Sequence, residues 1–303
     1  MDASVPLMKP LTEAKGIADA MPEILIEARR VASTVLAGWH GRRTSGRGET
    51  FWQFRPFTTG EAASAIDWRR SARDEHLFVR EKEWEAAHTM WLWADLSQSM
   101  NFRSRLAPTT KRTRATVLLL ALAEMLSVAG ERIGLLGASD PILARNGAER
   151  VAVLIPRAAE TAAPPDTRAL RRFSDVVLFG DFLDPIDEIE QTLNTILRTG
   201  ARAHLVQIID PIEETFPFAG RTEFVDPESG ARYVVSRAEQ YRDEYHNRLA
   251  GLRDHLRTLC GRLDWTFLVH RTDQPATQPL LALHARLADR THSLGLHASG
   301  RAA

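Results

Sequence analysis

The sequence predicts an α/β fold in which a mostly parallel β-sheet is covered by helices on both faces. Three observations carry this prediction. From residue 89 onward, short apolar runs alternate with longer amphipathic runs, as strands and helices do in a covered parallel sheet. Glycine follows two of the amphipathic runs, at Gly130 and Gly200, where it favours the left-handed end of a helix. Several apolar runs end at an aspartate, so we expect acidic side chains along one edge of the sheet.

Residues 1–88 are expected to form an N-terminal extension that packs on the main domain. Residues 1–40 are expected to be helical. Within them, Pro22 is well placed to begin a helix that runs to Leu36. Residues 41–60 are rich in glycine, arginine and threonine and are expected to be irregular. In residues 61–88, three aromatic side chains are expected to anchor the chain: Trp68, Phe78 and Trp84.

The main domain is expected to span residues 89–292, with an insertion at 211–236 and a flexible tail at 293–303. The runs expected to be strands are short and apolar: Thr89–Ala94, Arg132–Ala138, Val151–Ile155, Asp175–Phe179, Ala203–Ile209 and Trp265–His270. The runs expected to be helices are longer and amphipathic: Lys111–Ala129, Pro185–Arg198, Arg237–Leu259 and Thr277–Ala288. The insertion is expected to contain a hairpin, whose two strands and turn are Arg221–Val225, Arg232–Val235 and Asp226–Gly230.

The composition is that of an ordinary globular protein. The chain has 303 residues, of which 44% are hydrophobic, and its 39 basic and 39 acidic residues give a formal charge of zero. This balance argues against nucleic acid or a membrane surface as the partner. Arginines and tryptophans do gather between residues 42 and 80, as in proteins that bind single-stranded nucleic acid. Acidic residues are mixed with them, so we favour ion pairs that tie the extension to the sheet.

No segment has the character of a membrane anchor or a secretion signal. The longest apolar run, Ala115–Ala129, contains Glu124 and is shorter than the roughly 20 residues that a transmembrane helix needs. The N-terminal residues lack the continuous apolar stretch of a signal peptide. Cys260 is the single cysteine, which fits a reducing compartment. We therefore expect a cytoplasmic protein.

A cluster of oxygen-bearing side chains follows the first predicted strand. Asp95, Ser97 and Ser99 alternate along the chain at that point, and Asp181 follows the fourth predicted strand. In the common doubly wound order, the first and fourth strands flank the crevice in which ligands bind. Carboxylate and hydroxyl oxygens suit a hard cation such as Mg²⁺, which binds them at about 2.0–2.1 Å and keeps several waters. These residues are therefore predicted to form a Mg²⁺ or Mn²⁺ site with one coordination position open to a partner or substrate.

Two further aspartates, Asp210 and Asp273, follow predicted strands. We assign both to the edge at which a partner is expected to bind. A second interpretation ranks ahead for each of them, because aspartate commonly forms turns and caps helix N-termini. The same interpretation stays open for Asp95.

The residues around Asp95 also resemble a known motif. Asp95–Met100 resembles the metal-ion-dependent adhesion site (MIDAS) of von Willebrand factor A-like domains. A wider resemblance, to the bacterial domain-of-unknown-function family 58, is carried by several segments: Trp52–Arg55, Ile66–Arg73, Val79–Glu81, Gly130–Leu135, Gln207–Pro211 and His270–Asp273. This resemblance covers nearly the whole chain from about residue 22 to about residue 290.

The resemblance implies a von Willebrand A-like domain with an N-terminal extension. It implies action as an adaptor or co-chaperone beside a MoxR-type AAA+ ATPase. It also implies that Ser97 and Ser99 bind the cation directly and that Asp95 bonds to the waters of the cation. Asp181 matches the later acid of the motif. The motif takes a threonine from an intervening loop, for which Thr167 is the best match, although it does not follow a glycine.

Three functions are compatible with these observations. The first is a non-enzymatic binding module that captures a partner's carboxylate through bound Mg²⁺. The second is a Mg²⁺-dependent phosphoryl hydrolase with Asp95 as its nucleophile, although Ser97 stands where such enzymes have a second acid. The third is a metal-free scaffold, which the poorly matched threonine favours.

Overall fold

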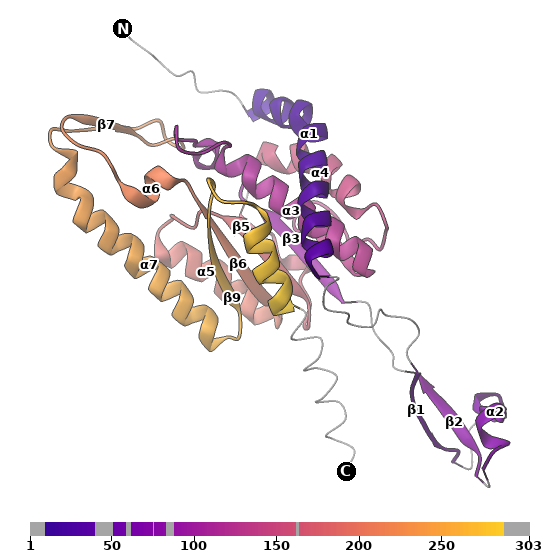
Figure 1. Cartoon of the computed structure of the whole chain (residues 1–303). Coiled ribbons are helices and arrows are strands. Elements are labelled where there is room, and N and C mark those ends of the chain that lie inside the picture. Colours follow the sequence, from indigo (N-terminus) through magenta and orange to yellow (C-terminus); the bar gives the residue numbers. More distant parts are fainter. Residues whose placement is uncertain are drawn as a thin grey trace. The chain divides into compact units, whose positions relative to one another are not determined.

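The computed structural model describes residues 10–39, 51–58, 62–74, 76–82, 88–161 and 164–287 of the chain. The chain forms two compact units (Figure 1). One comprises Met1–Gly38 together with His88–Ala303, and the other comprises Trp39–Ala87. The expected tail at 293–303 lies outside the described residues, and the domain bounds drawn from the sequence stay a prediction.

The larger unit is built on a parallel five-stranded sheet (Figure 1). Its strands are β3 (Thr89–Ala94), β4 (Arg132–Leu135), β5 (Asp175–Gly180), β6 (Arg202–Ile209) and β9 (Thr266–Arg271). They lie in the order β4-β3-β5-β6-β9, and each neighbouring pair is parallel. The central strand β5 is buried along its whole length. The sheet confirms the predicted α/β class with mostly parallel strands.

The two faces of the sheet bury alternate side chains of the same strands. In β3, Met90 and Leu92 join one apolar core, whereas Trp91 joins the other. The first core is completed by helices α1 (Pro10–Trp39), α3 (Lys111–Ala129), α4 (Gly147–Thr161) and a helix at 277–287. The second core is completed by α5 (Ile186–Thr199) and α7 (Arg242–Arg262). Helices therefore cover both faces of the sheet, as predicted.

Helix α3 has the bounds that the sequence predicts. It begins after Thr110, whose hydroxyl accepts a hydrogen bond from the Thr113 amide at 3.0 Å. It ends at Gly130 with a left-handed φ of 78°, and α5 ends at Gly200 with a φ of 76°. Glycine adopts this conformation without the steric cost of a β-carbon. Among the described residues, no helix, α3 included, has the length and apolar character needed to cross a membrane.

The prediction of a strand at Val151–Ile155 is wrong, because these residues lie inside α4. The run is continuously apolar, and such a run suits a buried strand or a buried helix equally well. The buried residues of α4 follow the helical spacing i, i+3, i+4 and i+7: Ala148, Val151, Ala152 and Ile155. Val153, in the middle of the run, points away from the core and is 78% exposed.

Residues 10–39 are helical, as expected, but the helix does not begin at Pro22. Helix α1 contains Pro22 in its interior rather than at its start. Proline removes one backbone hydrogen bond there, and the burial of one helix face in the first apolar core offsets that loss. The buried face comprises Met21, Ile24, Ala28, Val31, Ala32 and Val35.

The smaller unit contains a strand in a segment that was expected to be irregular. Strand β1 (Phe51–Pro56) pairs with β2 (Phe78–Lys82) in an antiparallel ladder. The short helix α2 (Trp68–Ser71) lies between them in the chain. Its N-cap is Asp67, whose carboxylate accepts a hydrogen bond from the Arg70 amide at 3.0 Å.

The predicted aromatic anchors of this unit have different outcomes. Phe78 packs edge-on against Phe54 at a centroid distance of 6.4 Å, and the Arg70 guanidinium lies 4.8 Å from the centre of the Phe78 ring. Phe78 is therefore an anchor, as predicted. The prediction is wrong for Trp68, which is 62% exposed. Trp84 lies outside the described residues.

The insertion after β6 contains the predicted hairpin. It begins with the short helix α6 (Pro211–Thr215), followed by strands β7 (Thr222–Val225) and β8 (Arg232–Val235), which pair in an antiparallel ladder. Single 3-10 turns occur at η1 (Ala63–Ala65), η2 (Ser99–Asn101), η3 (Thr167–Ala169) and η4 (Ala238–Tyr241).

A buried ionic cluster lies at the amino end of β5. Asp175 is 3% exposed and accepts two hydrogen bonds from the Arg202 guanidinium, at 2.6 and 2.9 Å. His88 Nε2 lies 3.1 Å from the same carboxylate, and His204 Nε2 lies 3.6 Å from it. Burial alone would raise the pKa of Asp175, but its three basic neighbours hold that pKa well below the usual range. In return, the Asp175 carboxylate raises the pKa of His88.

The contact between His88 and Asp175 makes stability depend on pH. The pKa of His88 is raised in the folded protein. The contact therefore stabilises the folded protein fully below the unfolded pKa of about 6.5, and this stabilisation is lost as pH rises through the folded pKa. We expect wild type to exceed His88→Gln in the free energy of unfolding at about pH 5.5, and this difference to shrink by about pH 9. Urea unfolding at the two pH values measures the difference. A difference that stays constant would show that the contact carries no charge on His88.

Candidate functional site

The two predicted acids lie at the carboxyl ends of neighbouring strands. Asp95 follows β3 and Asp181 follows β5, and these strands pair in parallel. Because β4 lies beyond β3 and β6 lies beyond β5, the strand order reverses between β3 and β5, where open sheets of this kind bind ligands. The predicted crevice is therefore present. Strand β5 is, however, the third strand of the sheet along the chain and not the fourth, because Val151–Ile155 is helical.

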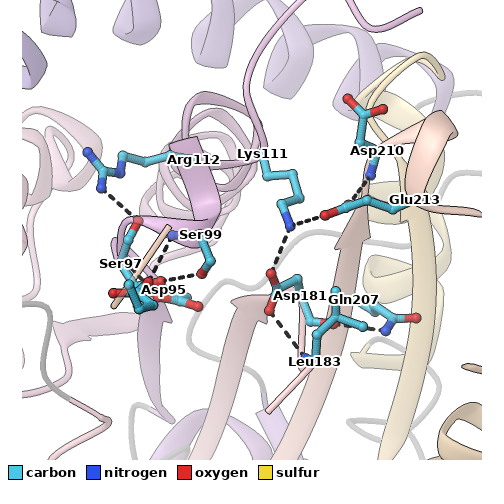
Figure 2. Close-up of polar contacts among 11 residues, drawn as sticks. Asp95, Ser97, Ser99, Lys111, Arg112, Asp181, Leu183, Gln207, Asp210 and Glu213 are labelled. Atoms are coloured by element: carbon cyan, nitrogen blue, oxygen red, sulfur yellow. Dashed lines mark hydrogen bonds and ion pairs between the residues drawn. The ribbon is translucent and has the colours of Figure 1, made fainter. Parts of the chain in front are cut away.

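The loop after β3 holds the two predicted serines beside Asp95 (Figure 2). The Ser97 amide donates a hydrogen bond to Asp95 Oδ1 at 2.9 Å, and the hydroxyl oxygens of Ser97 and Ser99 lie 2.9 Å apart. Met100 is fully buried and anchors the loop. Arg112 donates a hydrogen bond to the Ser97 carbonyl at 2.7 Å. The structure thus gathers Asp95 and both serines into one cluster of oxygen atoms.

The carboxylate of Asp95 lies in a region of excess negative charge. Burial raises the pKa of Asp95, and the nearby carboxylates of Asp181 and Asp184 raise it further, although hydrogen bonds from Ser97 lower it. Within the described part of the chain, no Lys, Arg or His side chain forms an ion pair with Asp95. Burial is the largest cause of this rise, and the smaller contributions of Asp181 and Asp184 are the part that favours a positive charge nearby.

Asp181 faces a buried lysine that the sequence does not single out (Figure 2). Lys111, the first residue of α3, is 1% exposed, and its Nζ lies 2.8 Å from Asp181 Oδ2 and 2.6 Å from Glu213 Oε1. The second Asp181 oxygen accepts a hydrogen bond from the Leu183 amide at 3.3 Å. Burial lowers the pKa of Lys111, but the two carboxylates outweigh burial and raise it. One ammonium group is therefore shared between two acids.

Asp210 is buried behind the site, where it caps a helix. Its carboxylate accepts hydrogen bonds from the amides of Ser104 and Ile212, at 2.8 and 2.9 Å. Its own amide donates to Glu213 Oε2 at 2.8 Å, which completes a capping box at the start of α6. The interpretation of Asp210 as a capping residue therefore describes its contacts. Since its exposure is 0%, it presents no carboxylate oxygen for the partner contact that we assigned to it.

Two other predicted residues lie in separate surroundings. Asp273 accepts two hydrogen bonds from the Arg271 guanidinium, at 2.7 and 3.1 Å, and this pairing lowers the pKa of Asp273. Its role at the partner-binding edge stays a prediction. Thr167 begins η3 beside Asp166, whose carboxylate pairs with Arg168. Among the described residues, no hydrogen bond joins the Thr167 side chain to the serine cluster, and its role as a metal ligand also stays a prediction.

Polar residues on β6 and α7 fix the position of Asp181. Gln207 Nε2 donates a hydrogen bond to the Asp181 carbonyl at 2.8 Å (Figure 2). Arg253 donates to Gln207 Oε1 at 2.8 Å and to Glu214 at 2.7 Å. Gln207 carries no sequence signal beyond its polarity in an apolar run, and Lys111 stands among other polar residues, where nothing distinguishes it. Glu213 has a signal, because it stands three residues after Asp210, at capping-box spacing.

The site opens into a cavity of about 1970 Å³ at this edge of the sheet. Part of its lining is polar: Asp95, Ser97, Ser99, Asp181, Asp184 and Glu228. Another part is aromatic and comes from the insertion and from the start of α7: Phe216, Phe218, Phe224, Tyr241 and Tyr245. The cavity therefore combines an acidic region with an apolar one.

The donor atoms of the serine cluster fit a small, hard cation. In the part of the chain that the structure describes, no three His, Cys, Asp or Glu side chains are placed to share a metal ion, so a cation here depends on hydroxyl oxygens. Two ligands at about 2.0–2.1 Å from Mg²⁺, at right angles to each other, lie about 2.9 Å apart. The hydroxyl oxygens of Ser97 and Ser99 have this separation, 2.9 Å. These serines would hold the cation, with Asp95 beside them and Asp181 shared with Lys111.

The chain is similar to proteins from mycobacteria and from Bacteroides. It is 27% identical over 266 residues to the uncharacterized proteins Mb1516 of Mycobacterium bovis and Rv1480 of Mycobacterium tuberculosis, over 81% of this chain and 82% of each relative. The structure of conserved hypothetical protein BatB from Bacteroides thetaiotaomicron matches with a TM-score of 0.39 and 9% identity. An aerotolerance-related membrane protein from Bacteroides fragilis matches with a TM-score of 0.37 and 12% identity. Each of these two matches covers 67% of this chain and 99% of the other.

A family model provides the assignment of the chain. The model described as "Protein of unknown function DUF58" matches residues 53–255. The match extends from strand β1 of the smaller unit to α7 of the larger unit and includes the serine cluster, Lys111 and Asp181. Because it spans more than half of the 303 residues, the chain belongs to the DUF58 family.

Proposed function

We propose that this protein is a non-enzymatic adaptor that captures a carboxylate of a partner protein through a divalent cation. Ser97 and Ser99 would hold the cation, Mg²⁺ or Mn²⁺, with Asp95 and Asp181 beside them, as in the MIDAS of von Willebrand factor A-like domains. One observation carries the proposal: the hydroxyl oxygens of the two serines lie 2.9 Å apart, next to an acid in a region of excess negative charge. Bound there, the cation would supply an open coordination position for an oxygen ligand.

The charges around the serine cluster support this proposal. Lys111 brings one positive charge, which Asp181 and Glu213 share. Arg112, which donates to the Ser97 carbonyl, brings a second positive charge. With Asp95 included, the three acids still outnumber the two cations. Because Asp181 and Lys111 are buried and Asp95 and Glu213 are half-buried, the effective dielectric is lower than that of water, and the attraction of these acids for a cation is stronger than it would be in water.

The partner that we propose is a MoxR-type AAA+ ATPase, for which this protein acts as an adaptor or co-chaperone. The support for the partner is the resemblance of the sequence to domain-of-unknown-function family 58, which implies action beside such an ATPase. A second support is the size of the cavity beside the serine cluster, about 1970 Å³, which is large enough to admit a segment of another protein.

Removing both hydroxyls is expected to abolish cation binding. In the variant with Ser97→Ala and Ser99→Ala, the two direct ligands are lost while Asp95 and the fold remain. We expect calorimetric titration with MgCl₂ to show binding to wild type and a loss of at least about tenfold in affinity in the double variant, since the two hydroxyls are the proposed direct ligands. Mg²⁺-dependent retention of the ATPase on the immobilised protein should be lost in parallel. The matched control is Ser33→Ala, because this exposed hydroxyl bonds, among the residues that the structure describes, only to the Arg30 carbonyl.

The same experiment separates the rival functions. Equal Mg²⁺ affinity in wild type and the double variant would contradict capture through the serines. A wild-type protein that binds the ATPase without binding Mg²⁺ would support the metal-free scaffold. Turnover of p-nitrophenyl phosphate that is lost in Asp95→Asn would support the phosphoryl hydrolase. The geometry favours that rival least, because the Ser97 hydroxyl, which occupies the place of a second acid, lies 2.9 Å from Ser99 Oγ and is a poor general acid at neutral pH.

A further inference from the structure

The candidate site already contains a carboxylate from a distant part of the chain. Glu228 Oε1 accepts a hydrogen bond from the Ser99 amide at 2.8 Å, across 129 residues of sequence. Glu228 stands in the turn between β7 and β8, and it lines the same cavity as Asp95 and Asp181. The tip of the hairpin therefore reaches the loop that we propose as the cation site.

The turn that carries Glu228 is well defined. The Glu228 amide donates a hydrogen bond to Asp226 Oδ1 at 3.0 Å, and the Gly230 amide donates to the Asp226 carbonyl at 2.8 Å. Gly230 has a φ of 71°, which favours glycine. The Asp226 amide closes the turn through a bond to the Ala231 carbonyl at 2.8 Å. Because the turn is fixed by its own hydrogen bonds, little entropy is lost when its carboxylate binds.

Other negative charges surround Glu228. Its carboxylate contributes to the raised pKa of Asp184, after burial and the charges of Asp181 and Glu188. Its hydrogen-bond donor is the neutral Ser99 amide, and no cationic side chain of the described residues forms an ion pair with it. These acids repel the Glu228 carboxylate, and because Glu228 is exposed, water weakens this repulsion. A divalent cation on the serine cluster would turn that repulsion into attraction.

We infer that Glu228 is an internal ligand that occupies the place of the partner's carboxylate. The inference rests on the proposed function, since it takes the captured group to be a carboxylate. In the absence of a partner, the hairpin β7–β8 closes the site, and a partner binds after the hairpin has moved away. The partner segment then has the chemistry of the hairpin tip, which is an acidic side chain presented in a tight turn.

The hairpin is attached loosely enough to move. Its two strands pair with each other and not with the main sheet. Three of its apolar side chains are at least half exposed: Val225, Tyr233 and Val234. Its anchor is Phe224, whose ring stacks on Phe216 at a centroid distance of 6.0 Å. A segment that buries so little apolar surface opens at a small cost in free energy.

Glu228→Ala is expected to open the site to a competing carboxylate. The probe is the synthetic peptide Val-Asp-Pro-Glu-Ser-Gly-Ala, which copies residues 225–231, titrated in the presence of MgCl₂. If the hairpin is closed for about nine-tenths of the time, the variant binds the peptide about tenfold more tightly than wild type. The Ser99 amide, which loses its acceptor, exchanges with solvent deuterium faster in the variant. The matched control is Glu223→Ala on the same hairpin, where the exposed carboxylate pairs with Arg232 and both readouts should equal those of wild type.

The outcomes separate this inference from the proposed function. Equal peptide affinity and equal Ser99 exchange in Glu228→Ala and wild type would overturn the internal ligand, even if Mg²⁺ binding through the serines is confirmed. A gain in peptide affinity that is the same with and without Mg²⁺ would support the internal ligand and contradict the cation. If the peptide binds no variant, Ser99 exchange decides: faster exchange in Glu228→Ala supports the inference, and unchanged exchange overturns it.

Discussion

Lys111→Met is expected to lower the free energy of unfolding by about 3–5 kcal/mol, as when one partner of a buried ion pair is removed. Methionine keeps most of the length of the side chain but removes the charge that Asp181 and Glu213 share. The side chains of Asp181 and Glu213, which are 7% and 18% exposed, then stay largely buried without the ammonium group between them. The variant also removes a positive charge from the first turn of α3, which offsets the loss by about 0.3–1 kcal/mol. Urea unfolding of the purified full chain measures the net change.

A double variant tests whether the lost charge is the cause. Glu213→Gln keeps an oxygen that can accept from the Asp210 amide, so the cap of α6 survives while one buried negative charge is removed. In the Lys111→Met background, this second substitution is expected to restore part of the stability, with a coupling energy of about 0.5–3 kcal/mol. The matched control is Arg257→Met, in which an exposed pair with Asp254 is broken and the change stays within about 0.5 kcal/mol.

Lys111→Met also reports on the proposed cation. In wild type, the ammonium occupies one oxygen of Asp181, so it competes with a divalent cation for that acid. We therefore expect MgCl₂ to stabilise Lys111→Met against urea more than it stabilises wild type. A loss of stability smaller than about 1 kcal/mol would contradict a structural role for the Lys111 charge, because a broken buried pair costs more than that. Equal stabilisation by MgCl₂ in both proteins would contradict the competition.

Much of the site's framework follows from local sequence. The bounds of α3 could be predicted because Gly130 ends it at a left-handed turn, which glycine favours. The position of Asp95 and Asp181 at the same edge of the sheet could be predicted because parallel strands align their carboxyl ends there. The hairpin could be predicted from its turn residues and its two short flanking runs, and its tip then proved to reach Ser99.

The partners of these residues could not be predicted, because they come from distant segments. Lys111 meets Asp181 across 70 residues and Glu213 across 102 residues. Nothing in the local spacing of a lysine identifies such a partner, since the contact depends on how α3 and α6 are placed over the sheet. Local patterns also fail where they are ambiguous. The apolar run at Val151–Ile155 is compatible with a strand and with a helix. The burial of Ala148, four residues before Ala152, has the spacing of a helix and distinguishes the two.

Asp175→Asn is expected to lower the free energy of unfolding by about 3–5 kcal/mol. The carboxylate is buried, and it accepts both hydrogen bonds of the Arg202 guanidinium at 2.6 and 2.9 Å. Asparagine preserves the shape of the side chain but offers one acceptor oxygen and no charge. Arg202 and the fully buried His204 then lose the negative group that compensates them at the start of β5. Since β5 is the central strand of the sheet, the site at its other end loses support as well.

The pH dependence distinguishes a lost charge from a lost shape. The pKa of Asp175 is depressed in the folded protein. The ionised carboxylate therefore contributes fully to the free energy of unfolding above the unfolded pKa of about 3.9, and this contribution is lost only as pH falls through the lower folded pKa. The deficit of Asp175→Asn should therefore persist at about pH 5 and about pH 7 and narrow toward about pH 2, where the carboxylate of unfolded wild type is protonated. Asp254→Asn, at an exposed pair with Arg257, should show no such deficit. An Asp175→Asn deficit below about 1 kcal/mol would mean that Arg202 and the two histidines do not depend on the charge of Asp175, since removing one partner of a buried pair costs more.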